Sequence, residues 1–264
     1  MSREPNHGPA AAGALQPSLA RRVVAEALGT AMLVAAVVGS GIMGERLAGG
    51  NVGLALLANT VATGAALFAL ILTFGPVSGA HFNPAVTIAD ATQGGITWPA
   101  ATAYVAAQSA GGLAGVAAAN GMFGLPTFFA AGHARHGVAQ LFSEFVATFG
   151  LLSVVWGCAR TRPAALVPFA VSAYIMAACW FTSSTSFANP AVTLARAATD
   201  TFAGIRPADV PAFVLAQLFG AAAATLLFRW LVPTLPARAG EVLVPHGANV
   251  AKQATRQTTT ERDE

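Results

Sequence analysis

The chain has 264 residues, of which 55% are hydrophobic and 9% are charged, and its formal net charge is +3. Soluble domains carry about 25% charged residues, so this composition argues against a water-soluble protein and favours helices that span a bilayer. The basic residues are scattered singly, which argues against a nucleic-acid partner. The two cysteines, Cys158 and Cys179, are too few for a disulfide framework or a zinc site, so no metal or cofactor is predicted.

Six segments are long and apolar enough to cross a bilayer, which takes roughly 20 residues per helix. A stretch rich in Pro, Ala and Gly, 1–18, precedes them without the apolar run of a signal peptide. Two shorter apolar stretches, 77–91 and 183–198, each contain an Asn-Pro pair and follow the second span of each half. A polar tail, 236–264, is predicted to be disordered and cytoplasmic, and 1–18 is predicted to be a cytoplasmic N-terminal tail. The predicted spans are 20–43, 53–74, 98–122, 138–159, 164–183 and 209–232.

The two halves of the chain repeat each other in sequence. SEFVATFG, with Glu144, echoes AEALGTAM, with Glu26, while AAQSAGG, with Gln108, echoes LAQLFGA, with Gln217. HFNPAVTIAD echoes FANPAVTLAR in the same order. Three spans per repeat is an odd number, so the second half enters the membrane from the opposite side. We therefore predict an all-α membrane protein with six transmembrane helices and two half-membrane re-entrant helices in an inverted repeat. This channel domain covers 19–235, with repeats at about 19–122 and 137–235.

Each short apolar stretch is predicted to be a half-helix that begins at its Asn-Pro pair, because proline is favoured in the first turn. Ten residues span about 15 Å, half of the roughly 30 Å hydrocarbon core, so two such helices meet at the midplane. Irregular backbone at that depth is tolerated only where it is buried or borders a polar cavity. We expect Asn83 and Asn189 to cap their helices through oxygen and to point their amide N–H groups into a lumen. Positive helix ends repel cations there, which suits neutral solutes. The motif residues are Asn83, Pro84, Ala85, Asn189, Pro190 and Ala191.

The distribution of Lys and Arg predicts the orientation. Ten lie on the side of the termini and four on the opposite side, and the more basic side stays in the cytoplasm. Both termini are therefore expected in the cytoplasm, in a multi-pass protein of the cell inner (plasma) membrane. The four on the other side are Arg46, Arg135, Arg196 and Arg206.

The motifs SGAHFNPAVT at 78–87 and ANPAV at 188–192, with the YVAAQ and LAQLFGA segments, resemble the aquaporin family of major intrinsic proteins. The resemblance covers about 20–232 and rests on paired, specific motifs. It implies a right-handed bundle of six helices and two half-helices, assembled as a homotetramer with one pore per subunit.

The same resemblance implies supporting roles for several buried polar residues. Glu26 and Glu144 match glutamates that hydrogen-bond the half-helix loops from behind, a role that we prefer over a proton relay. His81 is expected to pack beside the first motif instead of binding a metal. Gln108 and Gln217 are expected to tie neighbouring helices or loop carbonyls together.

The sequence departs from the family at the selectivity filter. Most members carry an arginine directly after the second NPA, where this chain has Val192. The family's spacing places the other filter residues at Thr63, Ala177 and Ser186. None is large or charged, so we predict a wide opening that passes glycerol, urea or the neutral hydroxide of trivalent arsenic. Arg196, one helical turn beyond Val192, is either a vestibule charge or a snorkelling interfacial arginine.

Two other functions remain open at this stage. A water-selective channel would use the same architecture with a narrower opening. An ion-coupled secondary transporter also uses inverted repeats and broken helices, although the spans offer few ionisable residues for coupling. No nucleophile, base and orienting group occur at a plausible spacing, so an enzyme is not predicted. The expected partners are small neutral solutes and the lipid bilayer.

Overall fold

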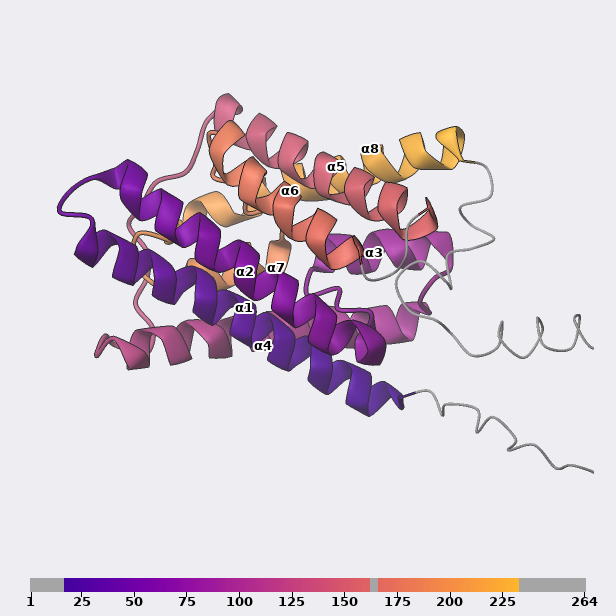
Figure 1. Cartoon of the computed structure of the whole chain (residues 1–264), viewed down its shortest axis with the longest axis horizontal. Coiled ribbons are helices and arrows are strands. Elements are labelled where there is room, and N and C mark those ends of the chain that lie inside the picture. Colours follow the sequence, from indigo (N-terminus) through magenta and orange to yellow (C-terminus); the bar gives the residue numbers. More distant parts are fainter. Residues whose placement is uncertain (1–16, 162–165, 233–264) are drawn as a thin grey trace, which may run out of the picture.

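The computed structural model describes residues 17–161 and 166–232 of the chain. Helices at all six predicted spans and at both half-helices confirm the predicted fold class (Figure 1). The predicted tails, 1–18 and 236–264, lie outside the described residues apart from positions 17 and 18. The helices are α1 Leu19–Leu47, α2 Val52–Ser78, α3 Pro84–Gln93, α4 Trp98–Met122, α5 Val138–Thr161, α6 Val167–Phe181, α7 Pro190–Arg196 and α8 Val210–Leu231, with a 3-10 turn, η2 Pro207–Asp209, before α8.

Local sequence signals set the ends of these helices. The Asn51 side chain accepts a hydrogen bond from Leu54 N at 3.1 Å and caps the start of α2. Gly79, with φ of 87°, ends the same helix in a left-handed conformation that glycine adopts at little cost. The re-entrant helix α3 ends in the same way at Gly94, with φ of 80°. The chain therefore leaves α2 sharply, and the polar segment before α3 stays short.

Each repeat contains one close crossing of two long helices that depends on a glycine. α1 packs along α4, and α5 packs along α8. A Cβ on Gly111 of α4 would lie 2.2 Å from the carbonyl oxygen of Ala27, and a Cβ on Gly220 of α8 would lie 2.4 Å from that of Phe145. Each glycine stands three residues after the glutamine of its repeat. Close helix contact at these two crossings therefore depends on the absence of a side chain.

The described helices define two ends of the molecule. α1 begins and α8 ends at one end, which we call the terminal face (Figure 1). The opposite end, the loop face, carries the connections 48–51, 123–137, 182–189 and 197–209. α3 and α7 each contact both α4 and α8. The two half-helices therefore lie inside the bundle, between the last long helices of the two repeats.

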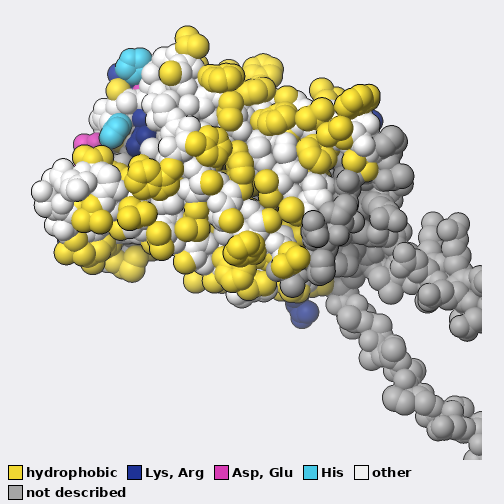
Figure 2. Space-filling view, turned by 45° about the horizontal axis from the view of Figure 1, so that its top comes forward, with side chains coloured by type: hydrophobic (Ala, Val, Ile, Leu, Met, Phe, Trp, Pro, Cys, Tyr) yellow, Lys and Arg dark blue, Asp and Glu magenta, His cyan; other side chains and the backbone are white. Residues whose placement is uncertain are grey.

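The flank of the bundle is apolar. Hydrophobic side chains cover the side seen in Figure 2, whereas the charged and histidine side chains visible there gather mainly toward the loop face. Large exposed side chains include Leu57 and Val61 of α2, Phe169 of α6, and Phe219 and Trp230 of α8. Four helical segments of the described chain are long and apolar enough to cross a membrane, namely 19–47, 52–78, 138–158 and 207–231. The chain is a multi-pass membrane protein. Polar side chains that are buried inside its bundle therefore need hydrogen-bond partners or a polar cavity beside them.

Candidate functional site: the lumen between the two half-helices

Both half-helices begin at their asparagine-proline motif. Asn83 is the N-cap of α3, and its Oδ1 accepts a hydrogen bond from Ala85 N at 2.9 Å. Asn189 is the N-cap of α7, and its Oδ1 accepts from Ala191 N at 3.0 Å and from Val192 N at 3.3 Å. The proline that follows each asparagine occupies the first helical turn. Each motif thus starts its helix with a satisfied cap.

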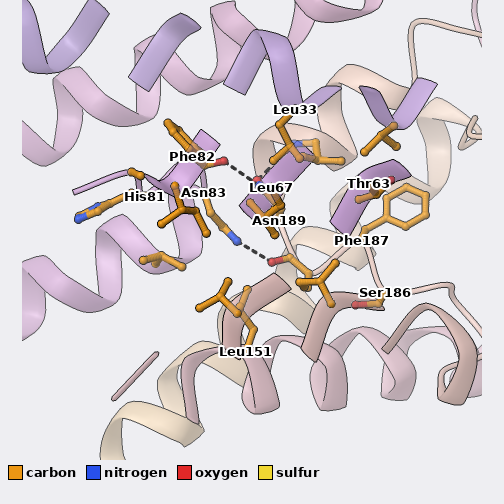
Figure 3. A pocket seen from close by; sticks show the side chains of 18 of the residues that line it. Leu33, Thr63, Leu67, His81, Phe82, Asn83, Leu151, Ser186, Phe187 and Asn189 are labelled. Carbon is orange, nitrogen blue, oxygen red and sulfur yellow. Dashed lines mark hydrogen bonds between the residues drawn. The ribbon is translucent and has the colours of Figure 1, made fainter. Parts of the chain in front are cut away.

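The two asparagines also hold the repeats together. Asn83 Nδ2 donates to the carbonyl oxygen of Ala188, and Asn189 Nδ2 donates to that of Phe82, both at 2.8 Å (Figure 3). This corrects the expectation that both amides point freely into a lumen, because one N–H of each amide is used across the repeat boundary. Both asparagines still border the cavity, at 4% and 6% exposure.

A buried glutamate holds the loop that precedes each half-helix. Glu26 accepts hydrogen bonds from His81 N at 3.0 Å, from Phe82 N at 2.7 Å and from Ser78 Oγ at 2.6 Å. Its counterpart Glu144 accepts from the backbone N–H groups of residues 187 and 188, both at 2.9 Å. Both carboxylates are fully buried. Backbone groups that would otherwise lack partners inside the bundle are therefore paired in both repeats.

A glutamine and a threonine extend this network in the first repeat. Gln108 Nε2 donates to Glu26 at 2.8 Å and to Thr87 Oγ1 at 2.9 Å. Thr87 Oγ1 lies 3.0 Å from His81 Nδ1 and donates to the carbonyl oxygen of Asn83. His81 thus lies beside the first motif and hydrogen-bonds within it.

The second repeat uses the equivalent glutamine and threonine. Gln217 Nε2 donates to Glu144 at 2.6 Å and to Thr193 Oγ1 at 2.8 Å. Thr193 Oγ1 donates in turn to the carbonyl oxygen of Asn189 at 2.8 Å. The sequence echo between the halves is therefore also a repeat of hydrogen bonds.

The held loops adopt strained backbone conformations. In the first repeat Ala80 and Phe82 have φ of 49°, and in the second Ser186 and Ala188 have φ of 51° and 48°. Such left-handed non-glycine residues cost roughly 1–3 kcal/mol each and persist where the surroundings over-determine them. All four residues border the same space, at the entrance of each half-helix.

That space is a cavity of about 110 Å³, with room for several water-sized molecules, that passes both motifs (Figure 3). Much of its wall is aliphatic: Leu33, Val37, Leu67, Ile71, Val86, Leu151, Val155, Val167, Val171, Ile175 and Val192. The polar residues that line it are Asn59, Thr63, His81, Asn83, Cys179, Thr185, Ser186, Asn189 and Arg196. Among the described residues, the hydroxyls of Thr63 and Ser186 are buried and make no hydrogen bond to protein.

Three of the four predicted filter residues line this cavity, and one does not. Thr63, Ser186 and Val192 border it at 8%, 6% and 5% exposure. Ala177 is exposed on the outer side of α6, so its assignment to the filter is wrong. The residues of α6 that do line the cavity recur every four positions and end at Cys179. Ala177 lies two positions away from that stripe, which turns it to the opposite side of the helix.

Arg196 lies inside the protein. Its side chain borders the cavity at 6% exposure, which contradicts the alternative of a snorkelling interfacial arginine. Its Nε donates to the carbonyl oxygen of Ala203, and its guanidinium carbon lies 3.4 Å from the centroid of the Phe187 ring. Among the described residues its terminal nitrogens make no hydrogen bond to protein.

Sequence reasoning missed two residues of this region. No role in the pore was predicted for Cys179, yet this residue borders the lumen. The four-residue spacing of the lining positions along α6 was the signal that could have found it. Arg135, in the connection 123–137, is buried at 8% exposure. Burial lowers the pKa of Arg135 to about 10, so the guanidinium stays charged at neutral pH. Nothing in the local sequence around Arg135 links it to the second motif.

Comparison with known proteins agrees with this geometry. The family model described as "Major intrinsic protein" matches residues 14–184. The chain is 55% identical over 220 residues to "Aquaglyceroporin AqpS" of Rhizobium meliloti (strain 1021), covering 83% of this chain and 93% of that protein. It is 39% identical over 181 residues to "Aquaporin NIP1-3" of Oryza sativa subsp. japonica, covering 66% of this chain and 62% of that protein. The solved aquaglyceroporin of Plasmodium falciparum matches with a TM-score of 0.60 at 16% identity, over 83% of this chain and 99% of that one; this likeness concerns the fold.

Proposed function

Because this chain belongs to the major intrinsic protein family, a family of membrane channels, we propose that it conducts solutes larger than water through a wide filter. It is a channel for small uncharged solutes and not an enzyme. The proposed solutes are water together with glycerol, urea or a neutral metalloid hydroxide such as that of trivalent arsenic. The name of the Rhizobium relative, an aquaglyceroporin, fits this range.

The observation that carries the proposal is Val192 at the position directly after the second motif. Val192 borders the cavity together with Thr63 and Ser186, and none of the three side chains is aromatic or charged. The family's usual pair, an aromatic side chain and an arginine, would occupy more of the opening. Thr63 and Ser186 are small residues on the cavity wall, which leaves space for a polyol or an amide at this point.

Passage is proposed to be passive, with cations rejected electrostatically. The N-terminal end of α3 begins at the cavity and carries about half a positive charge. Arg196 adds a full charge one turn beyond Val192, as a vestibule group with two donor nitrogens. The asparagine amides and the loop carbonyls then offer a hydrogen-bonding path to a neutral solute along an aliphatic wall.

Arg196 also gives weight to one alternative. A buried guanidinium at the cavity wall narrows the passage, which favours a water-selective channel. An ion-coupled transporter is a weaker alternative, since the two intramembrane carboxylates are already occupied by loop donors. Concentrative uptake driven by an ion gradient would revive that alternative.

Orientation and assembly extend the proposal. Both termini lie in the cytoplasm, supported by ten basic residues on that side against four on the other, so the loop face is external. The chain forms a homotetramer in the inner membrane, as the family resemblance implies, and its apolar flank (Figure 2) suits contact with lipid or with neighbouring subunits. Cross-linking of the purified protein in detergent would test the tetramer, and a monomeric mass would refute it.

Stopped-flow measurements on proteoliposomes test the solute range. Vesicles with and without the purified protein are exposed to gradients of sucrose, glycerol and urea, and their volume is followed by light scattering. We expect rapid water efflux together with glycerol and urea entry well above that of empty vesicles. Water flux with complete exclusion of glycerol and urea would refute the wide filter and support the water-selective alternative.

A further inference from the structure

The two repeats hold their re-entrant loops differently at one carbonyl group. Ser78 and Ser184 both stand five residues before the asparagine of their motif. In the first repeat, the hydroxyl of Tyr104 donates to the carbonyl oxygen of Ser78 at 2.9 Å. The residue equivalent to Tyr104, four positions before the glutamine of its repeat, is Phe213, which has no hydroxyl.

The rings nevertheless occupy matching places. Tyr104 packs edge-on against His81 with ring centroids 5.4 Å apart and an interplanar angle of 71°. Phe213 packs edge-on against Phe187 with centroids also 5.4 Å apart and an angle of 75°. His81 and Phe187 both stand two residues before the motif asparagine. The second repeat therefore has the ring of the first repeat without its hydrogen-bond donor.

Arg135 fills the place of that missing donor. Its Nη1 donates to the carbonyl oxygen of Ser184 at 3.3 Å, and its guanidinium carbon lies 5.0 Å from the Phe187 ring centroid. Its Nε donates to the carbonyl oxygen of Gly204 at 2.8 Å, and its Nη2 reaches that of Phe202 at 3.5 Å. One side chain from the connection between the repeats thus holds the segments before and after α7.

The carbonyl that Arg135 holds belongs to a strained peptide. The residue after Ser78 is Gly79, which takes a φ of 87° freely, whereas the residue after Ser184 is Thr185, a β-branched residue with φ of 61°. β-branched residues in this region are outliers. Thr185 and Ser186 border the cavity, so rotation of this peptide would move groups at the mouth of the lumen.

From these contacts we infer that Arg135 is a positioning residue that sets the outer opening of the channel, in the role that Tyr104 has in the first repeat. Arg135 does not border the cavity itself. It acts by holding the peptide between Ser184 and Thr185 and, through the shared Phe187 ring, the guanidinium of Arg196. This inference rests on the proposed channel function and names a determinant of its size selectivity.

The test measures solute ratios, not total flux alone. Proteoliposomes carrying Arg135→Ala are compared with wild type for glycerol, erythritol and sodium entry, each normalised to the reconstituted protein. We expect the erythritol-to-glycerol ratio to rise at least about threefold, with faster sodium entry, because a charge-assisted hydrogen bond to the loop is lost. A merely structural role would lower all fluxes together and leave this ratio unchanged.

A second substitution provides the rescue. Phe213→Tyr in the Arg135→Ala background places a hydroxyl where Tyr104 has one, within reach of the Ser184 carbonyl, and should return the ratio to within about twofold of wild type. The matched control is Arg46→Ala. Arg46 is another arginine of the loop face that lies 5.0 Å from a phenylalanine ring and donates to a carbonyl oxygen, but it is exposed and away from the cavity. The erythritol-to-glycerol ratio of this variant should stay at the wild-type value.

Each outcome decides the inference. An unchanged ratio in Arg135→Ala, or a changed ratio that Phe213→Tyr does not restore, overturns it. If Arg135→Ala does not fold, Arg135→Lys replaces it, because lysine keeps the charge but does not span three carbonyls, and an unshifted ratio there also overturns it. If the wild-type protein conducts water alone, the proposal of a wide filter is refuted independently of the inference about Arg135. The inference then stands only if Arg135→Ala admits glycerol.

Discussion

Replacing Glu144 with glutamine isolates the hydrogen bonds that hold the second re-entrant loop. Glu144 Oε1 accepts from Phe187 N, while Oε2 accepts from Ala188 N and from Gln217 Nε2. Glutamine keeps one acceptor oxygen and replaces the other with an NH2 group, which donates. At least one of the three donors therefore loses its acceptor inside the bundle.

The expected loss of stability in Glu144→Gln follows from the number of donors that lose their acceptor. A buried donor left without a partner costs about 1–3 kcal/mol. For a chain of this length 1 kcal/mol corresponds to roughly 2–4 °C in Tm, so one lost acceptor should lower the Tm by about 2–12 °C. The loop also holds Ser186 and Ala188 in left-handed conformations. Once released, it should relax into the lumen and reduce the flux per molecule.

Thermal unfolding in detergent and flux in proteoliposomes measure the two parts of this prediction. The control is Ser153→Ala, which removes a hydroxyl of the same helix that donates to the carbonyl of Phe149 within α5; its Tm should change by about 2 °C or less. A Glu144→Gln protein with the Tm and the glycerol flux of this control would refute the idea that the carboxylate holds the loop.

Four further substitutions probe the lumen and its packing. Val192→Arg adds a second guanidinium one turn before Arg196 on the same helix face, and glycerol flux should fall at least about tenfold relative to water flux because the opening narrows and the two charges repel. Arg196→Gln removes the charge at the mouth, and sodium entry should rise at least about tenfold while glycerol still passes. A mercurial thiol reagent should block most of the flux in wild type but not in Cys179→Ser, since that sulfur borders the cavity. Gly111→Val forces α1 and α4 apart at a contact with no room for a Cβ and should lower stability by about 1–3 kcal/mol or more.

Each of these predictions has its own contrary result. Val192→Arg with an unaltered glycerol-to-water ratio would mean that Val192 is not at the constriction. Unchanged sodium entry in Arg196→Gln would remove the vestibule role. Persistent mercurial block in Cys179→Ser, with loss of block in Cys158→Ser, would assign the reactive thiol elsewhere. A Gly111→Val protein as stable as wild type would contradict the close crossing of α1 and α4.

Most of the fold could be predicted from the sequence, because bilayer spans and broken helices have strong local signals. Long apolar runs marked all six spans, and the paired Asn-Pro motifs marked the first residues of α3 and α7. The buried partners of the half-helix loops, Glu26 and Glu144, were expected from the resemblance to the aquaporin family, which their equivalent places in the two repeats support.

The features that the sequence did not predict depend on the rotation of α6 about its axis and on hydrogen bonds between residues far apart in the sequence. Ala177 was placed by counting back from the motif, yet the bend between α6 and α7 decides which side of α6 meets the lumen, and Cys179 lies there instead. The asparagine amides pair across the repeat boundary, so neither acceptor is recognisable in the local sequence. Arg135 lies in an irregular connection, where charge alone gave no indication of its three carbonyl partners.

The crosswise asparagine bonds have a consequence for how the protein is made. The amide of Asn83 finds its acceptor 105 residues further along the chain, so the first half-helix leaves the ribosome well before its counterpart exists. During that interval the segment before α3 lacks its hydrogen-bond partner in the second repeat. It must therefore stay outside the hydrocarbon or be shielded by the insertion machinery. Seating of the first re-entrant helix is therefore a late event, completed only when the second repeat arrives.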